Sequence, residues 1–529
     1  MYDSVELSPH YDNTPNSQNP YIDERELIEL PAANQQDQGQ INEPYQKRYH
    51  FNPMNLPYNL EQPASYSARP PGPGERSVGN KMNMNSGDSR GPRLNRYYEN
   101  LKPYYKLKEL PAVVDKDKTL VFESRFESAN LRKAVKISDF EYDLFLKNDY
   151  ATNGFTQWYF FRVENTVKDK VYRFNIVNLM KGDSNYNQGM KPLIYSVKEA
   201  EESRIGWQRD GFNIAYYQTA RKKRNTQNNS SNSNASTASS VPPAITNGYG
   251  PVYYALSFEI RFRHDNDTVF FAHCYPFTYS DQCTFINKVC TFQNKDKIRK
   301  TVLCKSLAGN DVDMLIVTNF LSDPVDIAVR KSIILSSRVH PGESNASWLM
   351  NGVIDFLVSD DQHAEFLRST FVFKIVPMLN PDGVIVGNYR CSLMGQDLNR
   401  QWIGSSSKFY PINYHTKLMM KRTLESRDIF FFCDFHGHSI GRNVFMFGNN
   451  QTKPQERNKE KIFPMLFNEN IDMFGFEDCS FVVQKSKEST ARIVMWKEFQ
   501  LVNSFTLEAS FLGPNKGVNA GLHFNPTHY

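Results

Sequence analysis

A histidine and a glutamate stand three residues apart where an apolar run ends and a helix-like segment begins. They are His340 and Glu343, in SSRVHPGESNASWLMNGVIDFLVS. Imidazole nitrogen and carboxylate oxygen are both ligands of zinc, and a catalytic zinc keeps its fourth position for water. Alone, the pair is more typical of a helix that starts with an acidic residue, so a metal site needs a further ligand.

A third candidate ligand follows a second apolar run. The segment IFFFCDFHGHS places His436 and His438 where a strand should end. A single histidine is usually structural, but two at a strand end in the same region favour zinc. We predict that His436, at the last strand position, completes a site for one zinc ion per chain. We expect His438 to point elsewhere.

Polar residues between and after these motifs could bind a substrate or move a proton. The segment NPDGVIVGNYRCSLMGQDLNRQW contains Arg390, Asp397, Asn399 and Arg400. Guanidinium groups match carboxylates bidentately, so this set suits a carboxylate-bearing substrate near a metal. A surface loop with solvated charges is the alternative. In SFTLEAS, Glu508 stands among apolar residues, where a carboxylate is costly unless it is paired or functional.

Two kinds of element must position these residues. From about residue 300, strand-like runs alternate with helical segments, which is typical of an α/β domain with a largely parallel sheet. Sites in such sheets gather where strands end. Residues 109 to about 285 form short runs rich in β-branched and aromatic residues, which predicts an antiparallel sandwich. We therefore predict a β-sandwich at 109–290, followed by a mixed-sheet α/β domain at 291–529.

Composition limits the remaining possibilities. A chain of 529 residues with 40% hydrophobic residues suggests two or three domains, and a net charge of +5 does not argue for nucleic acid. We find no secretory signal and no membrane-length apolar run, and seven scattered cysteines are typical of reduced thiols in the cytosol. Residues 1–108 are predicted to be a disordered polar tail, and residues 221–250, which begin with RKKR, a flexible insertion.

Several segments resemble one protein family. HPGESN, LNPDGVIVGNYRCSL, QDLNR, DFHGHS and NSFTLEASF resemble the cytosolic carboxypeptidases, a branch of the zinc metallocarboxypeptidases that act on glutamylated tubulin. FESRFESANL, TQWYFFRVEN and FAHCYPFTYSD resemble the N-terminal β-sandwich of the same family. The resemblance covers roughly 119–529 and leaves out the tail and the insertion.

The resemblance implies a role for each candidate residue. Zinc would be bound by His340, Glu343 and His436. Arg390 would stabilise the oxyanion, Asp397 would orient the first zinc histidine, and Glu508 would be the general base. The pair that grips the terminal carboxylate of the substrate would be Asn399 and Arg400.

Acidic specificity has its own candidate in QKSKESTARIVMWKEF. The family match places Arg492 at the base of the substrate pocket, where a buried guanidinium can pair with a glutamate side chain. Apolar neighbours at 493–496 support this interpretation, whereas Lys485 and Lys497 fit a solvated helix face better.

The chain departs from the wider family in two ways. It has no tyrosine between Tyr414 and Tyr529, so the mobile tyrosine of pancreatic-type relatives has no counterpart. It also ends about twenty residues past Glu508, where relatives continue with a closing helix, so we expect a truncated catalytic domain.

Three functions follow from these observations. The leading one is deglutamylation of tubulin or other glutamate-rich tails in the cytoplasm, with cilia, axonemes or basal bodies as plausible addresses and with neither nucleic acid nor membrane as partner. A zinc deacylase of acylated amino acids uses a similar ligand set, but the long sandwich and QDLNR argue against it. A microtubule-binding pseudoenzyme would lack a ligand or the base, and this sequence retains all of them.

Overall fold

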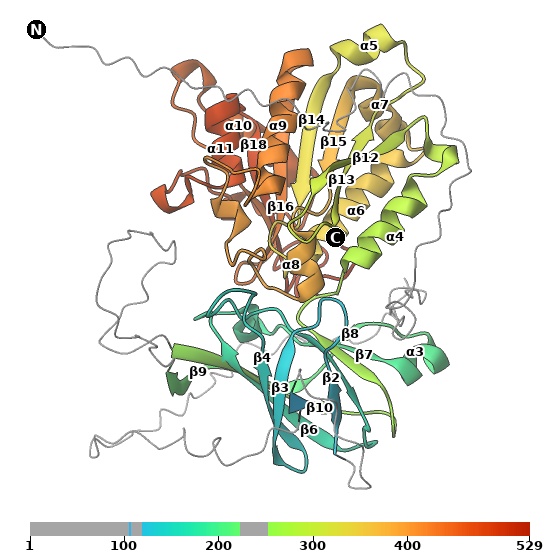
Figure 1. The fold of residues 1–529 in the computed structure, drawn as a ribbon, viewed down its shortest axis with the longest axis vertical. Coiled ribbons are helices and arrows are strands. Elements are labelled where there is room, and N and C mark those ends of the chain that lie inside the picture. The colour runs from blue at the N-terminus through green and yellow to red at the C-terminus, as the bar shows by residue number, and fades with distance from the viewer. Residues whose placement is uncertain (1–104, 107–118, 223–251) are drawn as a thin grey trace, which may run out of the picture. The chain divides into compact units, whose positions relative to one another are not determined.

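The structure is a computed structural model that describes residues 105–106, 119–222 and 252–529 (Figure 1). The predicted tail at 1–108 and insertion at 221–250 therefore lie almost entirely outside the described residues. The exceptions are strand β1 (Tyr105–Lys106) and the last two residues of strand β9 (Phe212–Lys222).

Two sheets form the N-terminal sandwich. The six-stranded sheet has the spatial order β1, β3 (Leu131–Ser138), β4 (Glu141–Leu146), β6 (Val171–Leu179), β10 (Val252–Arg261) and β9. The five-stranded sheet has the order β2 (Val121–Glu123), β5 (Phe160–Glu164), β11 (Val269–Ala272), β7 (Leu193–Ser196) and β8 (Gln208–Arg209). All pairings are antiparallel except that of β4 with β6, which is parallel. The prediction of an antiparallel sandwich is confirmed with that one difference.

Aromatic side chains hold the two sheets together. Phe174 on β6 and Phe271 on β11 are fully buried, and their ring centroids lie 5.2 Å apart in an edge-to-face arrangement. Phe122 on β2 meets Tyr142 on β4 at the same centroid distance. Large buried rings of this kind dominate core energetics, because each removes a large apolar surface from water. The aromatic enrichment in the sequence is therefore the inner face of the sandwich.

A seven-stranded mixed sheet carries the second half of the chain. Its spatial order is β12 (Ile298–Lys305), β13 (Asp311–Val317), β15 (Phe371–Val376), β14 (Lys331–Ser337), β16 (Ile429–His438), β18 (Ser504–Ser510) and β17 (Val444–Phe447). The central strands β15, β14, β16 and β18 are parallel, and the strands at both edges are antiparallel. This confirms the prediction of a mixed sheet.

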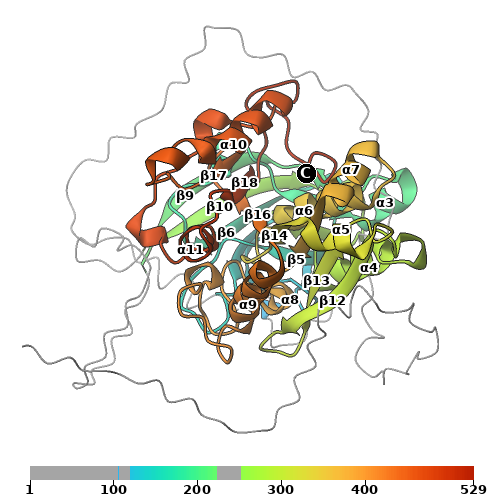
Figure 2. The same cartoon turned by 90° about the horizontal axis from the view of Figure 1, so that it is seen from above.

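Helices cover both faces of this sheet (Figure 2). One face carries α6 (Ser344–Val358), α7 (Gln362–Thr370) and α10 (Lys459–Asn470). The other face carries α9 (Pro411–Ser426) and α11 (Ala491–Phe499), which are linked by Lys417 and Glu498. The other α-helices of the described residues are α3 (Val197–Ser203), α4 (Tyr279–Val289), α5 (Pro324–Val329) and α8 (Pro381–Val386). Helix α4 ends just before the predicted domain boundary at 290 and packs against α6 and α8.

Parallel register brings the candidate residues to one edge of the sheet. Ser336 on β14 pairs with Asp434 on β16, and His436 on β16 pairs with Glu508 on β18. His340 follows the end of β14 by three residues. The carboxyl ends of parallel strands are where α/β sheets place their sites. Among the described residues, no helix is long and apolar enough to cross a membrane.

Candidate metal centre and its surroundings

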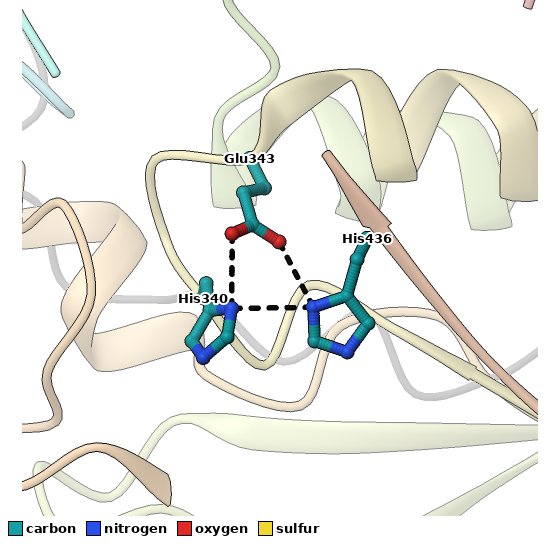
Figure 3. Close-up of side chains that lie close together, drawn as sticks. All are labelled: His340, Glu343 and His436. Carbon is teal, nitrogen blue, oxygen red and sulfur yellow. Dashed lines mark hydrogen bonds and ion pairs between the residues drawn. The ribbon is translucent and has the colours of Figure 1, made fainter. Parts of the chain in front are cut away.

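The predicted ligands meet in one buried cluster (Figure 3). The two carboxylate oxygens of Glu343 each lie 3.0 Å from a histidine Nδ1, one from His340 and the other from His436. The two Nδ1 atoms lie 3.2 Å from each other. Tetrahedral zinc with bonds of about 2.0–2.1 Å to nitrogen needs ligand atoms roughly 3.3 Å apart. The donor set and its spacing therefore fit zinc.

The electrostatics of the cluster are those of a cation site. Burial alone raises the pKa of Glu343, but the two histidines, His340 foremost, outweigh it and hold that pKa well below its usual range. Burial lowers the pKa of His436, but the carboxylates of Asp434 and Glu343 outweigh it and raise the pKa well above its usual value. Zinc must displace a proton at such a nitrogen, because metal ligands bind deprotonated.

The turn that carries the first two ligands is tightly constrained. Gly342 donates its N–H to the carbonyl of Tyr389 at 2.8 Å, and a Cβ at Gly342 would lie 2.8 Å from the Tyr389 ring. Only glycine permits this approach. Arg338, which is fully buried, donates from Nε to the Pro341 carbonyl at 2.8 Å. Sequence reasoning missed Arg338, although a charged residue inside an apolar run was a visible signal.

Each histidine has a carboxylate behind it. The Nε2 of His340 lies 3.1 Å from Asp397, as predicted, and the Nε2 of His436 lies 2.7 Å from Asp434. A carboxylate behind a ligand imidazole fixes its tautomer and orientation. Asp434 is fully buried and also accepts from the hydroxyl of Ser336 at 2.8 Å. Asp434 was missed, but its signal is the spacing DFH, which puts the acid and the histidine on one face of a strand.

Asp397 links the metal centre to the cationic residues. Arg390 donates from Nε to Asp397 at 2.7 Å, and Arg400 lies 3.9 Å from the same carboxylate. Burial raises the pKa of Asp397, but Arg390 and then His340 outweigh it, so the pKa stays well below its usual range. The amide nitrogen of Asn399 lies 3.5 Å from His436, and its oxygen accepts the N–H of Ala491 at 2.9 Å. The four residues predicted in this loop are therefore linked to one another or to the ligand histidines.

Glu508 and Arg492 lie on neighbouring elements, strand β18 and helix α11. Glu508 is partly exposed and sits beside His436 in register. Arg492 is buried and donates from one Nη to the Gly448 carbonyl and, at 2.7 Å, to the Asn449 side chain. Burial lowers the pKa of Arg492 to about 10, and Glu508 partly offsets that effect. The two residues therefore lie close enough to interact.

The other candidate residues have contacts or exposure of their own. Lys497 is half exposed and bonds to Glu488 at 3.2 Å, and Lys485 is exposed. His438 accepts the N–H of Gly441 at 2.6 Å and packs against a phenylalanine ring. Lys497 and Lys485 are therefore solvent-exposed, and His438 contacts Gly441 and Phe445. Lys487, by contrast, interacts electrostatically with both arginines of the loop and with the general-base candidate.

Comparisons with known proteins identify the family. Residues 122–228 match the model of the cytosolic carboxypeptidase N-terminal domain, and residues 288–473 match that of the zinc carboxypeptidases. Human cytosolic carboxypeptidase 2 is 45% identical over 422 residues, which are 79% of this chain and 44% of that protein. Mouse cytosolic carboxypeptidase 3 is 45% identical over 418 residues, 77% of this chain and 38% of that protein. The chain belongs to the cytosolic carboxypeptidase family.

Solved structures of metallo-carboxypeptidases share the fold. A metallo-carboxypeptidase from Burkholderia cenocepacia gives a TM-score of 0.58 at 18% identity, and it covers 78% of this chain and 94% of its own. One from Pseudomonas aeruginosa, in complex with (2-guanidinoethylmercapto)succinic acid, gives 0.57 at 21% identity, with 77% and 94% covered. This cytosolic carboxypeptidase chain spans less than half the length of the curated relatives named above. Zinc is the cofactor that the family and the donor set identify.

Proposed function

We propose that this chain is a zinc-dependent carboxypeptidase that removes C-terminal or side-chain glutamates from acidic protein tails, polyglutamylated tubulin above all. The observation that carries the proposal is the buried cluster of His340, Glu343 and His436 beside a group of cations at the carboxyl edge of the sheet. The family membership supports the same reaction class.

The chemistry divides among the residues of this edge. Zinc, when bound, polarises a carbonyl and lowers the pKa of water to about 7. Glu508 takes the proton of the attacking water and passes it to the leaving amine. Arg390 supplies a fixed cation for the charge that develops on the carbonyl oxygen. Asn399 and Arg400 bind the terminal carboxylate, which restricts cleavage to the last residue of a chain or branch.

Crowded cations favour an acidic substrate. Lys487 is exposed, and partial desolvation followed by the charges of Arg400 and Arg390 lowers its pKa. The buried Arg492 also has a lowered pKa. Such cations gain most from an anionic ligand, because a carboxylate supplies the missing opposite charge. A glutamate-rich tail offers several carboxylates in succession.

The first experiment measures zinc and product together. Purified protein is analysed for zinc by mass spectrometry and incubated with a polyglutamylated peptide, and free glutamate is quantified. We expect one zinc per chain and release of glutamate, with Glu508→Gln as the zinc-containing inactive control. A zinc-loaded protein that releases no amino acid from acidic peptides would contradict the proposal.

A second experiment tests acidic specificity. Arg492→Leu should lower the rate ratio of C-terminal glutamate to C-terminal leucine by about 10–100-fold, since a hydrogen bond to a charged group is worth about 1.5–3 kcal/mol. Lys497→Leu, on the same helix but paired at the surface with Glu488, is the matched control. An unchanged ratio in Arg492→Leu with zinc retained would move specificity to another residue.

A third experiment tests whether Arg400 binds the terminal carboxylate of the substrate. Arg400→Ala should raise KM for peptides with a free C-terminus, and amidation of the substrate should then matter less to the variant than to the wild type. Equal sensitivity of the two proteins to amidation would contradict the role of Arg400.

Tubulin and the cellular address are part of the same proposal. We place the protein in the cytoplasm, with cilia or basal bodies as the sites where glutamylated tubulin is concentrated. The test is loss of polyglutamylation from purified microtubules, followed by immunoblot. Activity on peptides without activity on microtubules would point to other glutamate-rich proteins.

A further inference from the structure

A carboxylate of the β-sandwich reaches the loop that carries Arg390. Asp149 lies between β4 and β5 and is only 3% exposed. Its two oxygens accept three successive backbone N–H groups, from Tyr389 at 2.6 Å, Arg390 at 2.7 Å and Cys391 at 2.8 Å. Three convergent N–H donors form a cradle for one anion.

The residues around Asp149 hold the same loop. The N–H of Tyr150 donates to Asn388 at 2.9 Å, and Lys147 donates to the Val386 carbonyl at 3.0 Å. The residues from 387 to 397 lie between α8 and the 3-10 turn Leu398–Arg400, outside any strand or helix. A segment of this kind takes its geometry from what it contacts, because it has no ladder of its own.

The loop at 387–397 carries Arg390 and its partner Asp397, and it contacts the turn that carries the first two metal ligands. The Arg390 side chain donates to Asp397, which stands behind the zinc histidine His340. The Tyr389 carbonyl accepts the N–H of Gly342 in the turn between the first two ligands. A shift of the loop would therefore move the cation that faces the carbonyl oxygen.

We propose that Asp149 is a positioning residue: it holds residues 389–391 so that Arg390 meets the developing charge, and this makes the β-sandwich a working part of the active site. The inference rests on the proposed function, which gives Arg390 its task. Positioning of this kind matters because a misplacement of about 1 Å can cost about 10²-fold in rate.

The pKa of Asp149 reflects both its burial and its hydrogen bonds to the loop. Burial raises the pKa of Asp149 to about 6, although the three N–H groups lower it. The ionised carboxylate is therefore costly to bury at neutral pH, but both of its oxygens can accept N–H groups, whereas an asparagine would turn an amide N–H toward one of the donors.

The test compares Asp149→Asn with Asp267→Asn. Asp267 is an equally buried sandwich carboxylate that accepts from Ser196 and Lys198, within its own domain. We expect folded Asp149→Asn protein to lose about 10–100-fold in kcat, with KM and zinc content close to wild type. Asp267→Asn should keep its kcat. Wild-type kcat in a folded, zinc-loaded Asp149→Asn protein would overturn the proposal.

Two further measurements test whether the loss of kcat in Asp149→Asn acts through Arg390 and the loop at 389–391. In an Arg390→Ala background, Asp149→Asn should cost no further kcat, because residues that act through one another are not additive; full additivity would contradict the proposal. Amide exchange should accelerate at 389–391 in Asp149→Asn and not at 434–438. Unchanged exchange would overturn the anchoring. A wild-type protein that is zinc-loaded but inactive would instead refute the proposed function, and the exchange result would still decide whether Asp149 anchors the loop.

Discussion

The two zinc-facing histidines are supported in different ways. His436 lies within β16, and the carboxylate behind it, Asp434, belongs to the same strand and bonds to the neighbouring strand. His340 lies on a turn, and the carboxylate behind it, Asp397, belongs to a loop. One half of the metal centre is therefore built into the sheet. The other half depends on the loop that Asp149 of the sandwich contacts.

This difference indicates which site residues are held rigidly by the sheet and which lie on a loop that can move. A strand in the middle of a parallel sheet opens only with global unfolding, whereas loops open at lower cost. The general-base candidate Glu508 is on the sheet side, and the cationic residues Arg390 and Arg400 are on the loop side. We expect substitutions on the sheet side to affect metal and proton transfer, and substitutions on the loop side to affect charge stabilisation and substrate binding.

The largest effect should come from the ligands themselves. His340→Ala and His436→Ala should both lose zinc and reduce activity to background, because two remaining ligands rarely hold a catalytic zinc. Zinc per chain, measured after dialysis, is the readout. Stoichiometric zinc in His436→Ala would transfer the ligand role to His438, which the structure turns toward Gly441.

The next effect tests the sheet side without removing the metal. Glu508→Gln should lower kcat by about 10²–10⁴-fold, the usual contribution of a general base, while zinc and substrate binding persist. Steady-state kinetics with parallel zinc analysis checks this. If the variant kept more than about a tenth of the wild-type rate, Glu508 would not be the base.

A direct comparison of the two supporting carboxylates sharpens the contrast. Asp434→Asn and Asp397→Asn should each weaken zinc binding by about 10–100-fold. Once both are saturated with zinc, only Asp397→Asn should keep a deficit in kcat, because Arg390 loses its partner. Titration with zinc buffers, followed by kinetics at zinc saturation, measures the loss of zinc affinity and the loss of kcat separately. Equal deficits at saturation would show that the supports are equivalent.

The smallest effect concerns pH and stability on the loop side. The pKa of Asp149 is raised from 3.8 to about 6, so the folded protein binds this proton more tightly than the unfolded chain. The resulting stabilisation is fully present below about pH 4 and is lost as the pH rises through about 6. Lys147 and the Cys391 thiol are the side chains that accompany Asp149 at this contact.

Asp149→Asn removes that titration. As the pH rises from 4 to 7, wild type loses this stabilisation and the variant does not, so the free energy of unfolding of the variant should increase relative to that of wild type by up to roughly 3 kcal/mol. Denaturant titrations at both pH values measure it. Asp267→Asn is the control, and parallel pH dependence of wild type and Asp149→Asn would exclude ionisation of Asp149 in this window.

Sequence patterns predicted much of this protein for clear reasons. The alternation of apolar strands and helices indicates an α/β sheet, because each element must bury one face. Strand ends then locate His340 and His436, since parallel strands share one carboxyl edge. The parallel pairing of β4 with β6 was not predicted, because strand pairing depends on contacts distant in the sequence. The roles of the other site residues came from the family resemblance and stay predictions: Arg390, Asp397, Asn399, Arg400, Arg492 and Glu508.

The sequence by itself determined the chemical inventory of the site: the candidate ligand types, the acids and the cations, because metal and carboxylate chemistry accepts few side chains. The role of Asp397 behind a zinc histidine came from the family resemblance. Only the tertiary structure decided which of them meet, and it added Arg338, Asp434 and Asp149. Asp149 stands 241 positions from Arg390 in the chain. No local pattern encodes that contact, because a carboxylate that binds backbone N–H groups selects its partners by position and not by residue type.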